Sequence, residues 1–292
     1  MSRSAGRRGD PPPAPDPLPI PVADGHCHLD LAHAGNPDTP QQALDLGAAL
    51  DRAVAVGIDR VVTVGTDLAS SAWSMRCAQQ DRRVVAAVAL HPNEAPLLAA
   101  HGQLDDALAQ IDALAGSDAR VRAVGETGLD RFRTDHADAA AAGAQRESFA
   151  THIRIANRHG LTLQIHDRDA HAEVLDVLDE IGAPQRTVLH CFSGDAGFAR
   201  ACVERGYVLS FAGNLTFGNA DALRAAAAVT PIDQLQVETD APFLTPMPYR
   251  GRPNASYLIP LTVRRLAEVK QVDVDELCAA LSATADRLYG PW

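Results

Sequence analysis

Short apolar runs and longer helical stretches alternate eight times along this chain. The runs, rich in β-branched residues, span residues 21–28, 59–65, 83–91, 121–127, 161–166, 187–192, 207–213 and 235–240. Helix candidates lie between them, and three end in Gly, a common residue where a helix stops: residues 39–57, 144–160 and 170–182. Eight repeats in about 270 residues predict an α/β fold, a (β/α)8 TIM barrel, with an open doubly wound sheet as the alternative.

The first 21 residues differ in composition from the rest of the chain. They are rich in Pro and polar residues and carry arginines without an apolar segment, so we expect residues 1–21 to form a flexible tail and not a signal peptide. No apolar run is long enough to span a bilayer. We therefore expect a cytoplasmic protein without a membrane partner, with residues 22–292 forming one domain.

Charge and cysteine content argue against two broad classes of protein. The formal net charge of −11 disfavours a wide basic surface that binds long nucleic acid. It is compatible with a small nucleic-acid substrate bound by metal ions and a few arginines. The five cysteines are odd in number and contain no C-x-x-C pair. They argue against a disulfide framework and favour a reducing compartment.

Side chains able to bind metal collect at one end of the predicted strands. His26 and His28 close the first run in "DGHCHLD", and further acids and histidines close later runs. These are Glu126 after the fourth run, His166 after the fifth, His190 after the sixth and Asp240 after the eighth. Barrel active sites form at the carboxyl ends of the strands, so we expect the six side chains to meet there.

Strand alternation predicts which way these side chains point. Successive residues of a strand face opposite sides, so His26 and His28 share a face and Cys27 points away from it. The same rule predicts polar residues facing inward beneath the ligands, namely Asp24, Thr162, Gln164, Gln236 and Glu238. It also predicts that Cys27 and Cys191 face the helices, which excludes a Cys/His zinc site built on them.

Four histidines and two carboxylates exceed the needs of one tetrahedral ion and suit two divalent ions bridged by a carboxylate. We predict one ion held by His26, His28 and Asp240, a second held by His166 and His190, and Glu126 as the bridge between them. Asp240 would also accept a proton from the attacking water, so Asp240 and Glu126 are the candidate catalytic residues. Imidazole ligands favour Zn²⁺ or Mn²⁺, whereas nucleases often use Mg²⁺, and the choice stays open.

Four further residues at the same end are weaker candidates for substrate binding. They are His91 at the end of the third run, Arg168 just after the fifth, and Arg250 and Arg252 in the loop after the eighth. Loops at this last position often bind phosphate in barrels, and arginine pairs with phosphate through two hydrogen bonds. The alternatives are a buried structural role for His91, beside Pro92, and solvated surface positions for the arginines.

Six short motifs occur in the order found in one known family. They are "DGHCHLD", "LHPNEA", "GETGLD", "IHDRDA", "HCFSG" and "ETDAPFLTP", followed by "RGRPN". From about Val22 to the C-terminus the chain resembles the TatD family of metal-dependent hydrolases, within the amidohydrolase-like barrels. The resemblance implies a (β/α)8 barrel, a divalent-metal centre and hydrolysis, and several members are deoxyribonucleases. Many members have Ser where this chain has Ala241, and no lysine follows the fourth run to form the carboxylated-lysine bridge of related amidohydrolases.

The predicted reaction is hydrolysis of a DNA phosphodiester bond, from a strand end, by a metal-activated water. The arginines and the resemblance support it, with DNA or another phosphodiester bound locally at the barrel mouth. An alternative is hydrolysis of an ester or amide, such as deacylation of aminoacyl-tRNA, because two-metal centres also act on carbonyl groups. A non-catalytic metal-binding barrel is a third hypothesis, disfavoured because burying six polar ligands without a metal costs stability.

Overall fold

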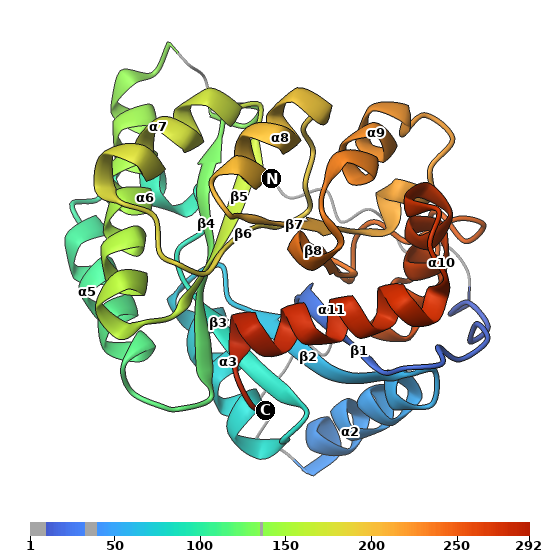
Figure 1. The fold of residues 1–292 in the computed structure, drawn as a ribbon. Coiled ribbons are helices and arrows are strands. Elements are labelled where there is room, and N and C mark those ends of the chain that lie inside the picture. The colour runs from blue at the N-terminus through green and yellow to red at the C-terminus, as the bar shows by residue number, and fades with distance from the viewer. Residues whose placement is uncertain (1–9, 33–39, 135–136) are drawn as a thin grey trace.

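The computed structural model describes residues 10–32, 40–134 and 137–292, and its centre is one eight-stranded sheet (Figure 1). The strands are β1 Val22–Cys27, β2 Ile58–Val64, β3 Val84–Val88, β4 Val121–Asp130, β5 Thr162–Arg168, β6 Thr187–Leu189, β7 Val208–Phe211 and β8 Leu235–Val237. Each strand pairs in parallel with the next one in the sequence, in the order β1 to β8. Each of the eight predicted runs therefore overlaps one of the eight strands, and β4 and β5 extend beyond their runs to Asp130 and Arg168.

The sheet curls into a nearly closed barrel, because the end of β1 meets the segment that follows β8. A parallel bridge joins Cys27 to Ala241. The main-chain N–H of Asp240 donates to the oxygen of His26 at 2.9 Å, and that of His28 donates to the oxygen of Ala241 at 2.7 Å. This contact confirms the predicted barrel and excludes the open doubly wound sheet.

Helices surround the barrel as an outer layer (Figure 1). In the described residues they are α1 Leu29–Ala32, α2 Pro40–Val54, α3 Leu68–Gln80, α4 Glu94–Ala100, α5 Leu104–Ala115, α6 Ala139–His159, α7 His171–Ile181, α8 Ala196–Glu204, α9 Asp221–Val229, α10 Ile259–Lys270 and α11 Val274–Tyr289. Three 3-10 turns complete them: η1 Gly213–Thr216, η2 Ile232–Gln234 and η3 Ser256–Leu258.

Local sequence signals explain where several of these helices begin and end. Asp67 caps the start of α3, since its carboxylate accepts the N–H of Ser70 at 2.7 Å while the Ser70 hydroxyl accepts the N–H of Asp67 at 3.0 Å. Gly160 follows α6 with φ of 63°, and Gly182 follows α7 with φ of 90°. Glycine adopts these left-handed angles without strain, so the two predicted helix ends are confirmed.

Small apolar side chains fill the barrel interior, and the C-terminal helix closes one end of it. Val62, Val64, Val85 and Ala87 belong to an inner cluster that also contains Tyr289 of α11. The hydroxyl of Thr162, the first residue of β5, donates to the oxygen of Leu288. Helix α11 therefore lies across the end at which the strands begin (Figure 1), and the opposite end is left for the predicted ligands.

The segment from residue 10 to residue 21 packs against the barrel, in contrast to the predicted flexible tail. Four basic or phenolic side chains donate hydrogen bonds to its main-chain oxygens: Arg252 to Asp10 and Pro11, Arg52 and Tyr257 to Pro12, and Arg264 to Asp16 and Pro17. The side chain of Leu18 is buried. We call residues 10–17 the strap; the first nine residues of the predicted tail lie outside the described residues.

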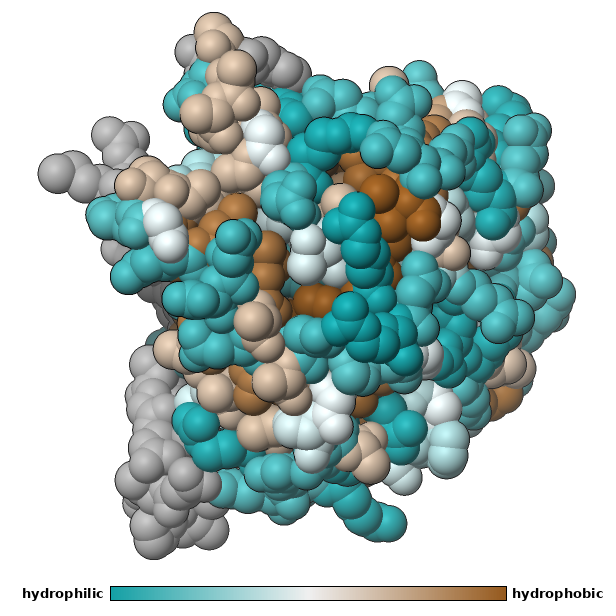
Figure 2. Space-filling model, turned by 90° about the vertical axis from the view of Figure 1, so that its left-hand side faces the viewer, coloured by the Kyte–Doolittle hydropathy of each residue, from teal (hydrophilic) through white to brown (hydrophobic). Residues whose placement is uncertain are grey.

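The outer surface is polar over the face shown in Figure 2. Hydrophilic residues cover most of that face, and apolar residues show mainly in the hollows between them. Within the described ranges, no helix combines the length and the apolar character that crossing a membrane requires. All five cysteines are free thiols.

Candidate metal centre

The six predicted metal ligands come together at the end of the barrel where the strands finish. Five of them, all except the fully buried His26, line a cavity of about 700 Å³ there. The main-chain contacts between β1 and the segment after β8 bring the His26–His28 pair beside Asp240. The long strand β4 carries Glu126 into the middle of the group.

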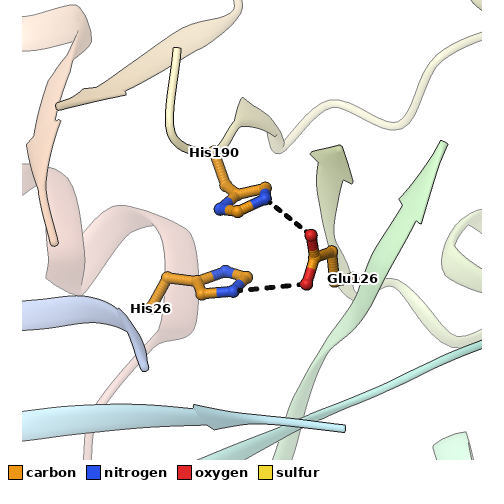
Figure 3. A group of neighbouring side chains, drawn as sticks. All are labelled: His26, Glu126 and His190. Carbon is orange, nitrogen blue, oxygen red and sulfur yellow. Dashed lines mark hydrogen bonds and ion pairs between the residues drawn. The ribbon is translucent and has the colours of Figure 1, made fainter. Parts of the chain in front are cut away.

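Glu126 lies between two sets of imidazoles. Its Oε2 is 3.7 Å from Nε2 of His26 and 3.6 Å from Nε2 of His28. Its Oε1 is 2.7 Å from Nδ1 of His166 and 2.9 Å from Nε2 of His190. Figure 3 shows the carboxylate facing both His26 and His190. This is the position required of a bridging carboxylate.

The electrostatic environment keeps Glu126 ionised. Burial alone would raise its pKa, but the charges of His190 and His91, with hydrogen bonds from His166 and His190, lower the pKa well below the usual glutamate value. The carboxyl is 4% exposed, so it holds a negative charge in a site with little water. An ionised carboxylate is the form that binds a cation.

Among the described residues, three overlapping groups of side chains have their donor atoms within 4.8 Å of one another. They are His26 with His28 and Asp240; His26 with Glu126 and His190; and His91 with Glu126 and His166. The first group has the same three members as the first predicted ion site. The second predicted pair is divided, because His190 groups with His26 whereas His166 groups with His91.

Hydrogen bonds on the outer side of three rings fix which nitrogen faces the centre. Nδ1 of His28 is 3.1 Å from the carbonyl oxygen of Val64, which can only accept, so this nitrogen carries the hydrogen. Nδ1 of His26 lies 2.8 Å from Oε1 of Gln164, and Nδ1 of His190 lies 3.2 Å from Oε1 of Glu238. All three Nε2 atoms therefore point inward, where a neutral ring can present its lone pair to a metal ion, as metal ligation requires.

The residues present fit a divalent cation. Nε2 of His26 is buried, and none of the described residues offers it a hydrogen bond. A buried acceptor without a donor destabilises a fold unless something binds it. Imidazole and carboxylate donors converging on one point are the set that Zn²⁺ and Mn²⁺ prefer.

His91 belongs to the cluster but has the opposite tautomer. Its Nδ1 accepts the main-chain N–H of Asn93 at 3.1 Å, so in the neutral ring Nε2 carries the hydrogen. That Nε2 lies 3.4 Å from Oε1 of Glu126. The ring therefore offers an N–H donor to the cavity and not a lone pair. The tautomer of His91 depends on the turn that follows β3, and no local sequence pattern predicts it.

Two predictions of side-chain direction made from alternation are wrong: that Asp24 faces inward, and that Cys191 faces the helices. β1 has an irregular register between Asp24 and Cys27, and the carboxylate of Asp24 accepts the N–H and hydroxyl of Thr239 at 2.9 and 2.6 Å instead of lying below the ligands. β6 ends at Leu189, so alternation does not reach Cys191, which is half-buried and lines the cavity. Cys27 is buried in the outer core, as predicted.

The predicted arginines have different surroundings from one another. Arg168 lines the cavity, with its guanidinium 3.9 Å from the ring centre of Phe132. Arg250 stacks on Phe217 at 4.3 Å, and Arg252 binds the strap; neither is among the described residues that line the cavity. Arg133, which sequence analysis did not select, does line it.

Comparison with known proteins agrees with this geometry. A sequence model described as TatD related DNase matches residues 23–290. The uncharacterized metal-dependent hydrolase TatD of Mycobacterium tuberculosis is 45% identical over 270 residues, which cover 92% of this chain and 98% of the relative. The uncharacterized metal-dependent hydrolase YabD of Bacillus subtilis is 33% identical over 267 residues, covering 91% and 98%. The crystal structure of YJJV, a TatD homolog from Escherichia coli K12, matches with a TM-score of 0.80 at 28% identity, covering 92% and 97%. The chain is therefore a metal-dependent hydrolase that belongs to the TatD family.

Proposed function

We propose that this protein hydrolyses phosphodiester bonds of DNA at the cavity above Glu126, acting from a strand end. The observation that carries the proposal is one ionised carboxylate between two sets of imidazoles, at the floor of a cavity whose wall includes Arg133 and Arg168. Two divalent cations, when bound there, supply Lewis acidity toward a phosphate and toward water. The family's description as TatD related DNase supports the same substrate.

Asp240 and His91 are placed to move or hold protons around the reacting group. The side chain of Asp240 is 15% exposed, lines the cavity and lies 3.5 Å from Nε2 of His28, so its free oxygen can accept a proton from an attacking water. His91 presents an N–H to the same space. We assign it the donor to a phosphate oxygen or to the leaving oxygen, the substrate role predicted from the sequence.

Exposed apolar side chains around the mouth favour an unpaired nucleotide. Leu31 and Phe243 line the cavity at 48% and 49% exposure, and Phe132 is 63% exposed beside Arg168. Aromatic rings and stacked arginines bind single-stranded nucleic acid through the faces of its bases, without sequence preference. A strand end with its bases unstacked therefore suits this rim better than a paired duplex does.

The test is a nuclease assay on a labelled single-stranded oligonucleotide. Purified protein with Mg²⁺, Mn²⁺ or Zn²⁺ should shorten it stepwise, and EDTA should stop the reaction. The variant Asp240→Asn should lower the rate about 100-fold or more, because it loses the proton acceptor. Asp105→Asn, at an exposed site on α5, is the matched control and should cleave normally.

Two results would overturn the proposal. DNA that stays intact beside stoichiometric bound metal, while an acyl ester is cleaved, would assign the centre to carbonyl chemistry instead. Cleavage that Asp240→Asn leaves unchanged would trace the activity to another nuclease in the preparation.

A further inference from the structure

A chain of polar side chains crosses the otherwise apolar interior of the barrel directly beneath the metal centre. Its members come from β5, β7, the end of β8 and the C-terminal helix α11, and each is at most 3% exposed. They are Gln164, Ser210, Gln236, Glu238 and Tyr289. Buried polar groups destabilise a fold unless each one has a hydrogen-bond partner. A buried polar chain of this kind therefore indicates a functional role.

The first half of the chain begins at His26. Nδ1 of His26 donates to Oε1 of Gln164 at 2.8 Å. The amide nitrogen of Gln164 donates to the hydroxyl of Tyr289 at 2.7 Å and to the carbonyl oxygen of Gly25 at 2.9 Å. The hydroxyl of Tyr289 then donates to Oε1 of Gln236 at 2.9 Å.

The second half returns to the centre at His190. The amide nitrogen of Gln236 donates to the hydroxyl of Ser210 at 3.2 Å, and that hydroxyl donates to Oε2 of Glu238. The other oxygen, Oε1, accepts the main-chain N–H of Cys191 at 2.7 Å and Nδ1–H of His190 at 3.2 Å. Above the chain the rings of His26 and His190 are stacked, 3.9 Å apart and 12° from parallel, which closes the loop.

Both ends of the chain fix the direction of its hydrogen bonds. The carbonyl oxygen of Gly25 can only accept, so the amide of Gln164 must turn its nitrogen downward and its oxygen toward His26. At the other end, Oε1 of Glu238 accepts the main-chain N–H of Cys191, and Oε2 accepts the hydroxyl of Ser210. Each intermediate group consequently donates toward Glu238, and Nδ1 of both histidines must carry the hydrogen.

The backbone is shaped to admit this chain. Gly25 has no side chain, and a Cβ there would lie 2.2 Å from the amide nitrogen of Gln236. Any other residue at position 25 would displace Gln236 and break the link between Tyr289 and Ser210. The small residue in "DGHCH" therefore leaves room for the polar chain.

We propose that Tyr289 is a positioning residue for the metal centre. Its hydroxyl, from the helix that closes the far end of the barrel, joins the two halves of the chain and so holds His26 and His190 in the tautomer that directs Nε2 at Glu126. Without the hydroxyl, Oε1 of Gln236 loses its hydrogen-bond donor, and the amide nitrogen of Gln164 keeps the carbonyl oxygen of Gly25 as its one remaining acceptor among these contacts. The preference for the observed orientation of Gln164 is then weaker, and the fraction of molecules with a rotated amide would present N–H to His26 and favour the wrong tautomer. The inference rests on the proposed metal centre and not on DNA as the substrate.

The test compares Tyr289→Phe with Tyr257→Phe. Phenylalanine keeps the ring packing and removes only the hydroxyl, and Tyr257 is a matched buried tyrosine whose hydroxyl binds Pro12 of the strap. Affinity for Zn²⁺ is measured by competition with a chelator, and ¹⁵N NMR of the imidazoles in metal-free protein reports their tautomers. We expect Tyr289→Phe to weaken Zn²⁺ binding about tenfold, which is the low end of the effect known for groups that orient metal ligands without touching the metal. We also expect the spectra to show a mixture of imidazole tautomers. Tyr257→Phe should change neither.

Ser210→Ala provides an independent test should Tyr289→Phe fold poorly. It breaks the second half of the chain with a minimal change of volume, and we expect a similar loss of Zn²⁺ affinity, because Glu238 loses the hydroxyl that orients its carboxylate against His190. Unchanged affinity and tautomers in both variants would overturn the proposal, as would an equal loss in Tyr257→Phe. If the protein does not cleave DNA but the variants show the expected changes in metal affinity, the proposal for Tyr289 is supported and the proposed nuclease function is not. The two proposals can therefore be tested independently.

Discussion

Glu126 is the single carboxylate on which both sets of histidines converge. Each of its oxygens faces a different set, and the pKa lowered by the surrounding imidazoles keeps it charged despite its burial. In a site with little water, one negative charge placed between two sets of imidazoles acts on a cation bound by either set. Losing it would therefore affect the whole centre and not one ion alone.

Glu126→Gln should test this directly. The amide has nearly the same shape but no charge, so we expect the affinity for metal to fall by more than about 100-fold, beyond the range known for partners outside the direct ligands. Metal content after dialysis, measured by mass spectrometry, checks it. If Glu126→Gln retained two equivalents of metal, Glu126 could not be the bridging ligand.

His91 should behave differently from the histidines that present a lone pair. Its Nδ1 accepts from Asn93, so it donates from Nε2 and is not needed to hold metal. His91→Ala should keep the metal content and lower kcat/KM for the oligonucleotide about tenfold or more, the value of one hydrogen bond to a charged group. Loss of one metal equivalent would instead make His91 a ligand.

The ligands could be predicted from sequence, but their surroundings could not. His26 and His28 follow from alternation along a strand, and Asp240 from its place at the end of another. Arg252 looked equally suited to phosphate, yet its partners are main-chain oxygens of Asp10 and Pro11, more than 240 positions away. No local pattern carries that information.

The contact between α6 and the two neighbouring strands depends on one buried histidine. His152 accepts the main-chain N–H of Leu90 at Nε2, at 3.2 Å, and its Nδ1 lies 2.9 Å from the hydroxyl of Thr127. Burial lowers its pKa to about 4. A proton on Nε2 would face the N–H of Leu90, so this ring is neutral when the helix is docked.

His152 therefore makes stability depend on pH. The unfolded chain takes up this proton below its ordinary pKa of 6.5 and the folded chain only near 4, so its contribution is complete above about 6.5 and is lost as the pH falls toward 4. The loss amounts to about 3 kcal/mol by linkage. His152→Gln should lack this part of the pH dependence in urea unfolding, whereas the exposed His101→Gln should follow the wild type. Parallel curves for wild type and His152→Gln would contradict the assignment.

The loops after β4 and β8 supply the aromatic residues of the rim. Phe132 and Phe243 are both about half exposed or more, and although Arg168 covers one face of Phe132, each ring keeps surface that a base can contact. Phe132→Ala and Phe243→Ala should each raise KM for single-stranded DNA about tenfold with little effect on kcat, because stacking on one base is worth about 1–3 kcal/mol. Leu97→Ala, at an exposed site on α4, is the control. An equal change in all three variants would argue against stacking.

The two ends of the molecule have separate tasks. The metal centre lies at the end where the strands finish, while α11 closes the other end. The side chain of Tyr289 in α11 reaches into the barrel interior and contacts Gln164 below the centre. The barrel itself was predictable, because eightfold alternation of strand and helix leaves few other arrangements. The polar chain was only half predictable: alternation gave Gln164, Gln236 and Glu238 as inward residues, but not Tyr289, which lies on a helix more than 50 positions later.

Arg252 should contribute to stability and not to substrate binding. Arg252→Ala removes its hydrogen bonds to the strap, so we expect the free energy of unfolding to fall by about 1 kcal/mol while KM stays unchanged. Arg168→Ala, at the cavity wall, should raise KM and leave stability nearly intact. Chemical denaturation and steady-state kinetics on both variants check the contrast. A raised KM in Arg252→Ala would show that Arg252 binds the substrate after all.

The way the strap is held bears on how freely it can vary. Five of the eight residues of the strap are prolines, which have no N–H to offer, and the described side-chain bonds to the strap all end on main-chain oxygens. A guanidinium that binds a peptide oxygen does not distinguish alanine from leucine. Related chains can consequently exchange most side chains here without loss of attachment, provided that the extended, proline-favoured course of the backbone is kept.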